Sequence, residues 1–289
     1  MIFILLSILT ASSFGLLFKY FERHGLDAFQ VIVVNYLTAC IVGMLTIWSF
    51  PFSLSTFLEA WFPYAVVLGS VFFYSFNLIA KSIAKAGISA TMVAAKMSLV
   101  IPTFAGVLLF GEGLGWYKVI GIVIALGSVW LTLSKPCNSN NTKATNLSFL
   151  PLVIFVVGGL QDTLFGYNQR QNLNPNNFEE FTIAVFFCAF AAGLVATIYK
   201  LGKGTLKFES RNIAGGIAIG IPNYFSIFFL VQALELPGFG TSVIFPVLNI
   251  GIIAFSAIAA LVLFKEKLFV KNWIGVGLAL VAIFLMSRG

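Results

Sequence analysis

The feature that most constrains this chain is an internal repeat. The segment Ala105–Leu131 recurs without a gap as Ala259–Leu285, 154 positions later. Each copy reads as an apolar stretch, an acidic break and a second apolar stretch. Ten positions coincide: Ala105/Ala259, Leu109/Leu263, Phe110/Phe264, Glu112/Glu266, Leu114/Leu268, Ile120/Ile274, Gly121/Gly275, Ala125/Ala279, Leu126/Leu280 and Leu131/Leu285. The repeat predicts that one structural unit is used twice, which decides the architecture before any other feature does.

The composition indicates that this unit lies in a membrane. Hydrophobic residues make up 60% of the chain and charged residues 9%, whereas about a quarter of a soluble domain is charged. A membrane-crossing helix needs roughly 20 apolar residues. We predict ten such spans, over 2–19, 28–49, 61–84, 89–110, 115–134, 147–168, 180–200, 212–234, 239–264 and 269–287.

A polar break divides these spans into five and five. We predict a first repeat over 1–134, a linker over 135–146 and a second repeat over 147–289. Because each repeat has an odd number of spans, the second enters the bilayer from the side opposite to the first. The expected fold is therefore an all-α integral membrane protein of ten transmembrane helices in two inverted five-helix repeats. Many secondary transporters are built from two inverted repeats of this kind. In this alignment Gly69 in the third span corresponds to Gly220 in the eighth.

The repeated motif resembles the EamA domain of the drug/metabolite transporter superfamily. In each copy Glu-x-Leu is followed by Ile-Gly and a helix rich in small residues. The first copy also has Pro102 ten positions before Glu112, whereas the second has Ser256 at the equivalent position. The resemblance implies a substrate carrier. Glu112 and Glu266 are interpreted as carboxylates placed before a helix N-terminus at the membrane boundary, with proton coupling as the alternative.

Two charged residues fall inside predicted spans. Lys96 follows Ser89 by seven residues, about 10 Å along a helix, and a lysine at that depth costs about 2.5 to 3.5 kcal/mol. We expect Lys96 to bind an anionic group, with snorkelling to the interface as the alternative. Asp162 is expected to carry a proton or to neutralise Lys96, with a structural buried pair or an interfacial position as alternatives.

Several uncharged polar residues are secondary candidates for the substrate site. They are Asn77, Tyr74, Asn223, Tyr224 and Asn249. The alternative for each is a hydrogen bond between helices. Pro102 and Pro246 predict bends in the fourth and ninth spans, and Pro222 frees a backbone carbonyl in the eighth.

We therefore expect a secondary transporter that moves a small organic metabolite, favouring export of an amino acid or related carboxylated compound. Multidrug and nucleotide-sugar or triose-phosphate carriers of the same superfamily are alternatives, and a non-transporting receptor or scaffold is an alternative of another class. We expect no enzyme, because the chain has one histidine, His24, and neither HExxH nor GxSxG. Without a GxxxxGK[ST] motif, a proton or substrate gradient is the expected driving force.

The expected location is the bacterial inner membrane, as a monomer or homodimer without cofactor, metal or nucleic acid. Two arguments disagree on orientation. Of the 17 basic residues, 13 follow odd-numbered spans, three lie on the side of the termini and Lys96 lies within a span. By the positive-inside rule this puts the termini outside. The family resemblance implies cytoplasmic termini, and we follow the resemblance.

Overall fold

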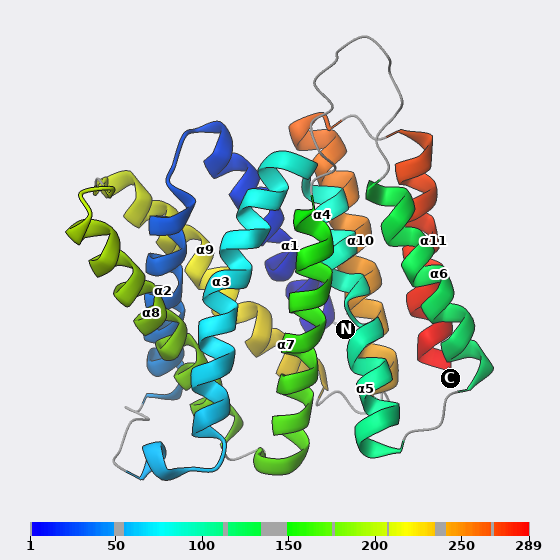
Figure 1. The fold of residues 1–289 in the computed structure, drawn as a ribbon, viewed down its shortest axis with the longest axis horizontal. Helices are drawn as coiled ribbons and strands as arrows, with labels where there is room; N and C mark the ends of the chain where they lie inside the picture. Colours follow the sequence, from blue (N-terminus) through cyan, green and yellow to red (C-terminus); the bar gives the residue numbers. More distant parts are fainter. Residues whose placement is uncertain are drawn as a thin grey trace. The chain divides into compact units, whose positions relative to one another are not determined.

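The structure is a computed structural model, and it describes residues 2–48, 55–111, 115–133, 149–174, 177–206, 208–234, 241–266 and 269–288. These residues form helices and no strand (Figure 1). The helices are α1 (Ile2–Arg23), α2 (Ala28–Ile47), the short 3₁₀ helix η1 (Thr56–Leu58), α3 (Phe62–Ala86), α4 (Ile88–Met97), α5 (Val100–Phe110), α6 (Trp116–Leu133), α7 (Leu150–Asn172), α8 (Phe178–Gly202), α9 (Ser210–Leu234), α10 (Thr241–Phe264) and α11 (Val270–Arg288). Glu112 and the predicted linker 135–146 lie outside the described residues.

The helices have the length and composition that a bilayer requires. Within the described residues, nine segments are long and apolar enough to cross a membrane. One of them joins α4 and α5 as Ile88–Leu109, and α6 adds the shorter apolar segment Trp116–Thr132. The chain is therefore an all-helical integral membrane protein, as predicted.

The chain divides into two compact units. The first contains Met1–Lys19, Leu78–Gly159 and Ser226–Gly289, and the second contains Tyr20–Asn77 and Leu160–Phe225. We describe the two units separately. These units are defined by contacts in space, whereas the repeats predicted over 1–134 and 147–289 are defined by similarity in sequence. The repeat boundaries stay a prediction.

In the first unit, α6 and α11 pack directly against each other (Figure 1). A Cβ added at Gly121 of α6 would lie 2.5 Å from Met286 Cγ and 3.0 Å from Ala282 O. A Cβ at Gly275 of α11 would lie 2.3 Å from Thr132 Oγ1 and 3.0 Å from the carbonyl oxygen of Ser128. The start of each helix therefore packs on the end of the other, so the pair is antiparallel and needs glycine at both points.

The second unit contains an equivalent pair of close contacts. A Cβ at Gly69 of α3 would lie 2.6 Å from Val185 O of α8. A Cβ at Gly220 of α9 would lie 2.7 Å from Asn35 O of α2. At both positions the neighbouring atom is backbone, which cannot move aside like a flexible side chain. Helices α2 and α8 also pack against each other.

The fourth predicted span is broken. It consists of α4 and α5, separated by Ser98 and Leu99. The proline ring of Pro102 clashes with the carbonyl of the residue four positions earlier, which is Ser98. The break is bridged by shorter hydrogen-bonded turns, including a 2.9 Å bond from Ile101 N to Ser98 O. The sequence predicted a bend at Pro102, and the structure interrupts the helix just before it, whereas α10 runs unbroken from Thr241 to Phe264.

Candidate functional site

Lys96 lies beside the break in the middle of a membrane-crossing segment. That segment runs from Ile88 to Leu109, so its centre falls at Ser98–Leu99. Lys96 occupies the last turn of α4 and is half-buried. A helix C-terminus carries a partial negative charge that favours a cation by about 0.3 to 1 kcal/mol. The broken helix therefore gives a physical reason why a lysine is tolerated at this depth.

The face of α4 that carries Lys96 is defined by its contact with α1. A Cβ added at Gly15 would lie 2.9 Å from Met92 Cε and 3.0 Å from Ile88 Cγ2. Residues four apart lie on one face of a helix, so Lys96 continues the stripe that Ile88 and Met92 begin. Glycine at position 15 lets α1 approach this stripe closely.

Helix α7 contacts the break in the first unit. A Cβ at Gly158 would lie 3.3 Å from Ser98 Oγ, and one at Gly159 would lie 2.4 Å from Ile101 Cδ1. Ser98 Oγ itself donates to the carbonyl oxygen of Ala95 at 2.6 Å. The break is thus packed against a glycine pair and has its own hydroxyl bonded to the end of α4.

Asp162 belongs to the second unit, and its side chain is exposed. It lies in α7, one turn after Gly158. The neighbouring residue Gln161 accepts a 3.1 Å hydrogen bond through Oε1 from Ser75 Oγ of α3. Since Lys96 belongs to the first unit, the pairing of Lys96 with Asp162 stays a prediction.

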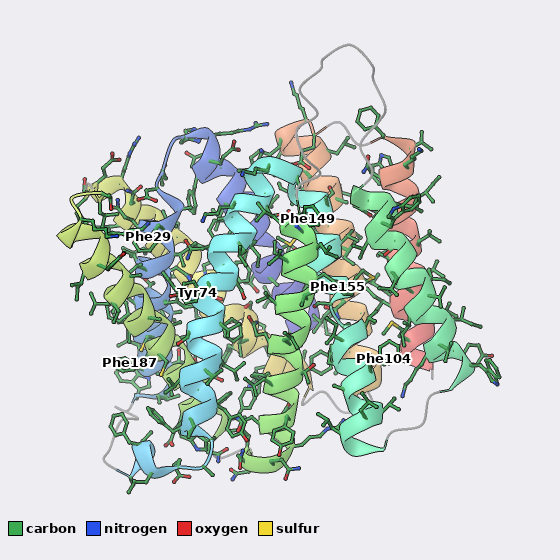
Figure 2. The ribbon with its side chains drawn as sticks, viewed as in Figure 1. Phe29, Tyr74, Phe104, Phe149, Phe155 and Phe187 are labelled. Carbon is green, nitrogen blue, oxygen red and sulfur yellow. The ribbon has the colours of Figure 1, made fainter. Side chains whose placement is uncertain are left out.

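Tyr74 and Asn77 lie on α3 in the second unit. Figure 2 labels Tyr74 on α3. Its side chain is 60% exposed, and its ring packs edge-on against Phe73 with 5.5 Å between centroids. Asn77 Nδ2 donates to the carbonyl oxygen of Phe73 in its own helix at 2.8 Å. Tyr74 is therefore accessible, whereas one Asn77 donor is used within α3.

Asn223 and Tyr224 are both 5% exposed. Asn223 Nδ2 donates to Asn35 Oδ1 of α2 at 3.1 Å. The ring of Tyr224 lies against Gly43 of α2, where an added Cβ would be 2.9 Å from Cε2. The Asn223 bond agrees with its alternative interpretation as a hydrogen bond between helices, whereas the contact of Tyr224 with α2 is ring packing. Asn249 lies in α10 in the first unit and is half-buried.

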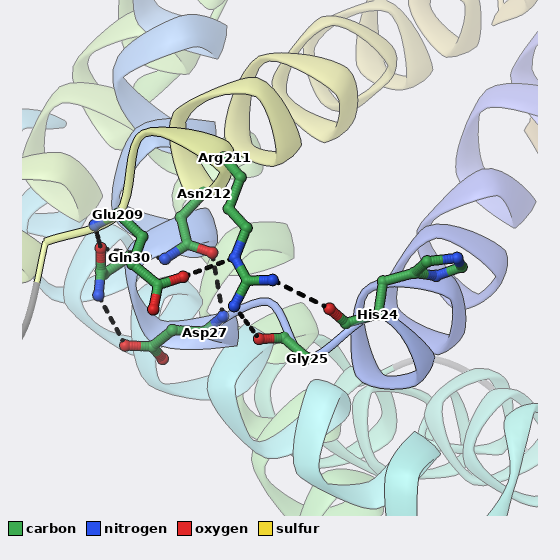
Figure 3. Close-up of polar contacts among 7 residues, drawn as sticks. All are labelled: His24, Gly25, Asp27, Gln30, Glu209, Arg211 and Asn212. Atoms are coloured by element: carbon green, nitrogen blue, oxygen red, sulfur yellow. Dashed lines mark hydrogen bonds and ion pairs between the residues drawn. The ribbon is translucent and has the colours of Figure 1, made fainter.

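A polar network at the start of α2 was missed by the sequence argument. Asp27 is the N-cap of α2, and its Oδ1 accepts from Phe29 N at 3.0 Å while its Oδ2 accepts from Gln30 Nε2 at 3.0 Å. The backbone N–H of Asp27 donates to Asn212 Oδ1 at 3.1 Å. Asn212 Nδ2 donates to Gln30 Oε1 at 3.2 Å (Figure 3). An aspartate before an apolar run is an N-cap signal, but nothing in the sequence identifies Asn212 as its partner.

Arg211 extends this network to the turn between α1 and α2. Its Nη2 donates to the carbonyl oxygen of Gly25 at 3.1 Å, and its Nη1 donates to that of His24 at 3.4 Å. Glu209 forms an ion pair with its Nε (Figure 3). Gly25 has a φ of +65°, a conformation that favours glycine. All these polar groups bond to one another, so the network fastens α9 to the α1–α2 turn.

The described residues contain no group of three or more His, Cys, Asp or Glu side chains that could hold a metal ion. Apart from the carboxylate of Asp162, the candidate site residues supply a lysine, side-chain amides and tyrosine hydroxyls. Such groups can bind an organic anion through charge and hydrogen bonds.

No family model matches the chain. An "uncharacterized protein" of Haemophilus influenzae is 30% identical over 225 residues, which cover 77% of this chain and 74% of the relative. The chain belongs to the same family as this protein.

A solved crystal structure of another protein has the same fold as this family member. It matches with a TM-score of 0.62 over 99% of this chain and 95% of the other, at 15% sequence identity. At that identity the similarity concerns the fold alone. The helical architecture is thus one that has been observed by crystallography.

Proposed function

We propose that this protein is a secondary transporter of the EamA type in the bacterial inner membrane, moving a small carboxylated metabolite such as an amino acid. The observation that carries the proposal is Lys96 beside the mid-span break between α4 and α5. Interrupted helices near the bilayer midplane form substrate and ion sites in many transporters.

The close helix contacts support two inverted halves. Gly121 contacts residues 282 and 286, and Gly275 contacts residues 128 and 132. Each of these numbers differs from its counterpart by 154, the spacing of the sequence repeat. The two equivalent helices are antiparallel, which is the relation expected between copies of opposite orientation.

The second unit supports the same relation through different helices. Gly69 contacts residues 185 and 189, whereas Gly220 contacts residues 35 and 38. A shift of 151 converts Gly69 into Gly220, and converts positions 35 and 38 into 186 and 189, which agrees within one residue. Two inverted halves provide a mechanism for alternating access, in which each half in turn opens one side of a shared site.

In this mechanism Lys96 binds the carboxylate of the substrate. Asp162 binds an ammonium group or carries a coupled proton. Tyr74, Asn77 and Asn249 contribute hydrogen bonds, and Asn223 and Tyr224 hold their helix against α2. We propose export as the direction and a proton or substrate gradient as the driving force, with cytoplasmic termini.

Transport by purified protein in liposomes tests this function. Labelled amino acids, nucleobases and cationic drugs are offered with and without a pH gradient. We expect uptake of carboxylated compounds, and Lys96→Ala abolishes it while Lys81→Ala, at an exposed lysine of α3, does not. Asp162→Asn removes the pH dependence.

The outcomes separate the candidate functions. Uptake of cationic drugs that survives Lys96→Ala indicates a multidrug carrier. Uptake of phosphorylated sugars or sugar nucleotides indicates a triose-phosphate or nucleotide-sugar carrier of the same superfamily. No transport of any compound by folded protein, together with saturable ligand binding, indicates a receptor or scaffold.

A further inference from the structure

The half-helix that carries Lys96 is capped by a residue from another helix. Glu266 Oε1 accepts a 2.9 Å hydrogen bond from the backbone N–H of Ile88, the first residue of α4. These residues are 178 positions apart. Gly87 occupies the N-cap position, where serine, threonine, aspartate or asparagine usually supplies the cap. The side chain of Glu266 takes over that role.

The backbone on both sides is shaped for this contact. Gly87 has a φ of +92°, and a Cβ added there would lie 3.1 Å from both carboxylate oxygens of Glu266. On the other side, Lys265 has a φ of +52°, an uncommon conformation for a residue with a side chain. The N–H of Glu266 then donates to the carbonyl oxygen of Ala260 at 3.1 Å. The chain after α10 is therefore turned so that Glu266 reaches the start of α4.

The first turn of α4 depends on its N-terminal contacts, because the first backbone N–H groups of a helix have no partner within the helix. A carboxylate stabilises the positive N-terminal end of a helix, and a cation stabilises the negative C-terminal end. The carboxylate of Glu266 lies at the N-terminal end of α4, and Lys96 lies in its last turn. The two charges thus stabilise the same half-helix from opposite ends.

We propose that Glu266 is a positioning residue for Lys96, which it holds in place by fixing the N-terminal end of α4 to the end of α10. This inference rests on the proposed function for the role of Lys96, but the contact itself does not depend on it. Loss of the cap would let the first turn of α4 open and would change the height and direction of Lys96. Substrate binding would weaken, while later steps would keep their rate.

Hydrogen exchange tests the contact without a substrate. In lipid nanodiscs, Glu266→Ala is expected to speed amide exchange of a peptide covering 87–97 by about fivefold, the effect of removing an N-cap. Glu266→Gln keeps a hydrogen-bond acceptor on a side chain of equal length, so the exchange rate of this peptide is expected to stay within about twofold of that in the unmodified chain. Gly87→Ala crowds the carboxylate and resembles Glu266→Ala. Glu59→Ala, at an exposed carboxylate, is the control and changes nothing in α4.

The position of Lys96 is measured directly with Lys96→Cys in a chain whose Cys40, Cys137 and Cys188 are alanine. Reaction with a soluble maleimide is expected to change at least fivefold on Glu266→Ala and to stay within twofold on Glu266→Gln. In the transport assay of the lysine-containing protein, Glu266→Ala raises KM at least fivefold with kcat within twofold, and Glu266→Gln restores KM.

Unchanged exchange of 87–97 in Glu266→Ala would overturn the capping role. Faster exchange with an unchanged labelling rate at position 96 would overturn the positioning role, as would equal effects of Gln and Ala. If the unmodified protein carries no substrate, the proposed function fails, whereas exchange and labelling still decide the role of Glu266.

Discussion

The side-chain amide of Asn223 donates a hydrogen bond to the side-chain oxygen of Asn35, with 3.1 Å between the two atoms. Asn35 is completely buried, and its own Nδ2 has no hydrogen-bond partner among the described residues. The bond joins α9 to α2 beside the close contact at Gly220. An interhelical hydrogen bond in a membrane protein contributes about 0.6 kcal/mol on average and up to about 1.7.

Asn223→Leu is therefore expected to lower stability by about 1 to 2 kcal/mol, because it leaves both polar groups of Asn35 buried without a partner. The double variant Asn35→Leu/Asn223→Leu is expected to recover most of the loss, since no unpaired amide remains. Thermal unfolding in detergent measures both. Asn77→Leu, which removes a bond within α3, is the control with a smaller effect. A double variant less stable than Asn223→Leu would contradict this account.

The contact between α6 and α11 predicts a difference between two glycines of α11. Gly275→Ala places a Cβ within 3.0 Å of the backbone N of Thr132, and such overpacking typically costs about 1 to 3 kcal/mol. Gly277 has nothing within 4 Å, so Gly277→Ala is neutral or gains up to about 1 kcal/mol from helix propensity. Thermal unfolding of the two variants checks the prediction, and equal midpoints would show that the helices are less tightly packed than described.

Equivalent halves predict equivalent effects at Gly69 and Gly220. Alanine at either position meets backbone atoms below 3.0 Å. Each variant should therefore lose about 1 to 3 kcal/mol, with values that agree within measurement error. Gly166→Ala in α7, where nothing lies within 4 Å, is the control. A large effect at only one of the two glycines would count against the repeat relation in this unit.

Replacing Pro102 should make α4 and α5 one continuous helix. Pro102→Ala supplies a backbone N–H and relieves the clash with the carbonyl of Ser98. We expect slower amide exchange across 97–105, because the added N–H completes the helical hydrogen bonds, and lower transport, because Lys96 shifts when the turn at Ser98–Leu99 becomes regular α-helix. Pro222→Ala in the unbroken helix α9 is the matched control. Full transport with a continuous helix would separate the break from the function.

If the two halves are inverted as proposed, Glu112 and Glu266 are expected to lie on opposite faces of the membrane. Cysteines introduced at the two positions, in a chain without other cysteines, are expected to react with a membrane-impermeant maleimide from opposite sides of oriented vesicles. Reaction of both from one side would refute inverted halves, whatever the transport assay gives.

Much of the helical layout was predictable because apolar length is a local property. The spans predicted at 2–19 and 269–287 correspond to α1 and α11, with ends that differ by a few residues. The break in the fourth span was also foreseeable, since Pro102 acts on a carbonyl only four residues away. The bend predicted at Pro246 stays a prediction, and α10 continues through that position as a helix.

Partners across the chain were not predictable. Asn223 and Asn35 are 188 positions apart, and a polar residue in a span indicates that it needs a partner without naming it. Glu266 was expected to lie before a helix N-terminus, and α11 follows it in sequence. Its carboxylate caps α4 instead, because the turn at Lys265 directs it there. Asp162 gives the same lesson, since apolar neighbours in sequence did not make its side chain buried.

The break at Ser98–Leu99 has no counterpart in α10, and the residue 154 positions after Lys96 is Ile250. One copy of the repeated pattern carries both a cation and a helix interruption, while the equivalent helix of the other copy is continuous and contains no charged residue. A substrate bound at Lys96 would therefore be held mainly by groups of one copy, so its two exits would not be energetically equivalent. Such an asymmetry would give the two openings different affinities for the substrate, while the direction of net transport would still be set by the gradient.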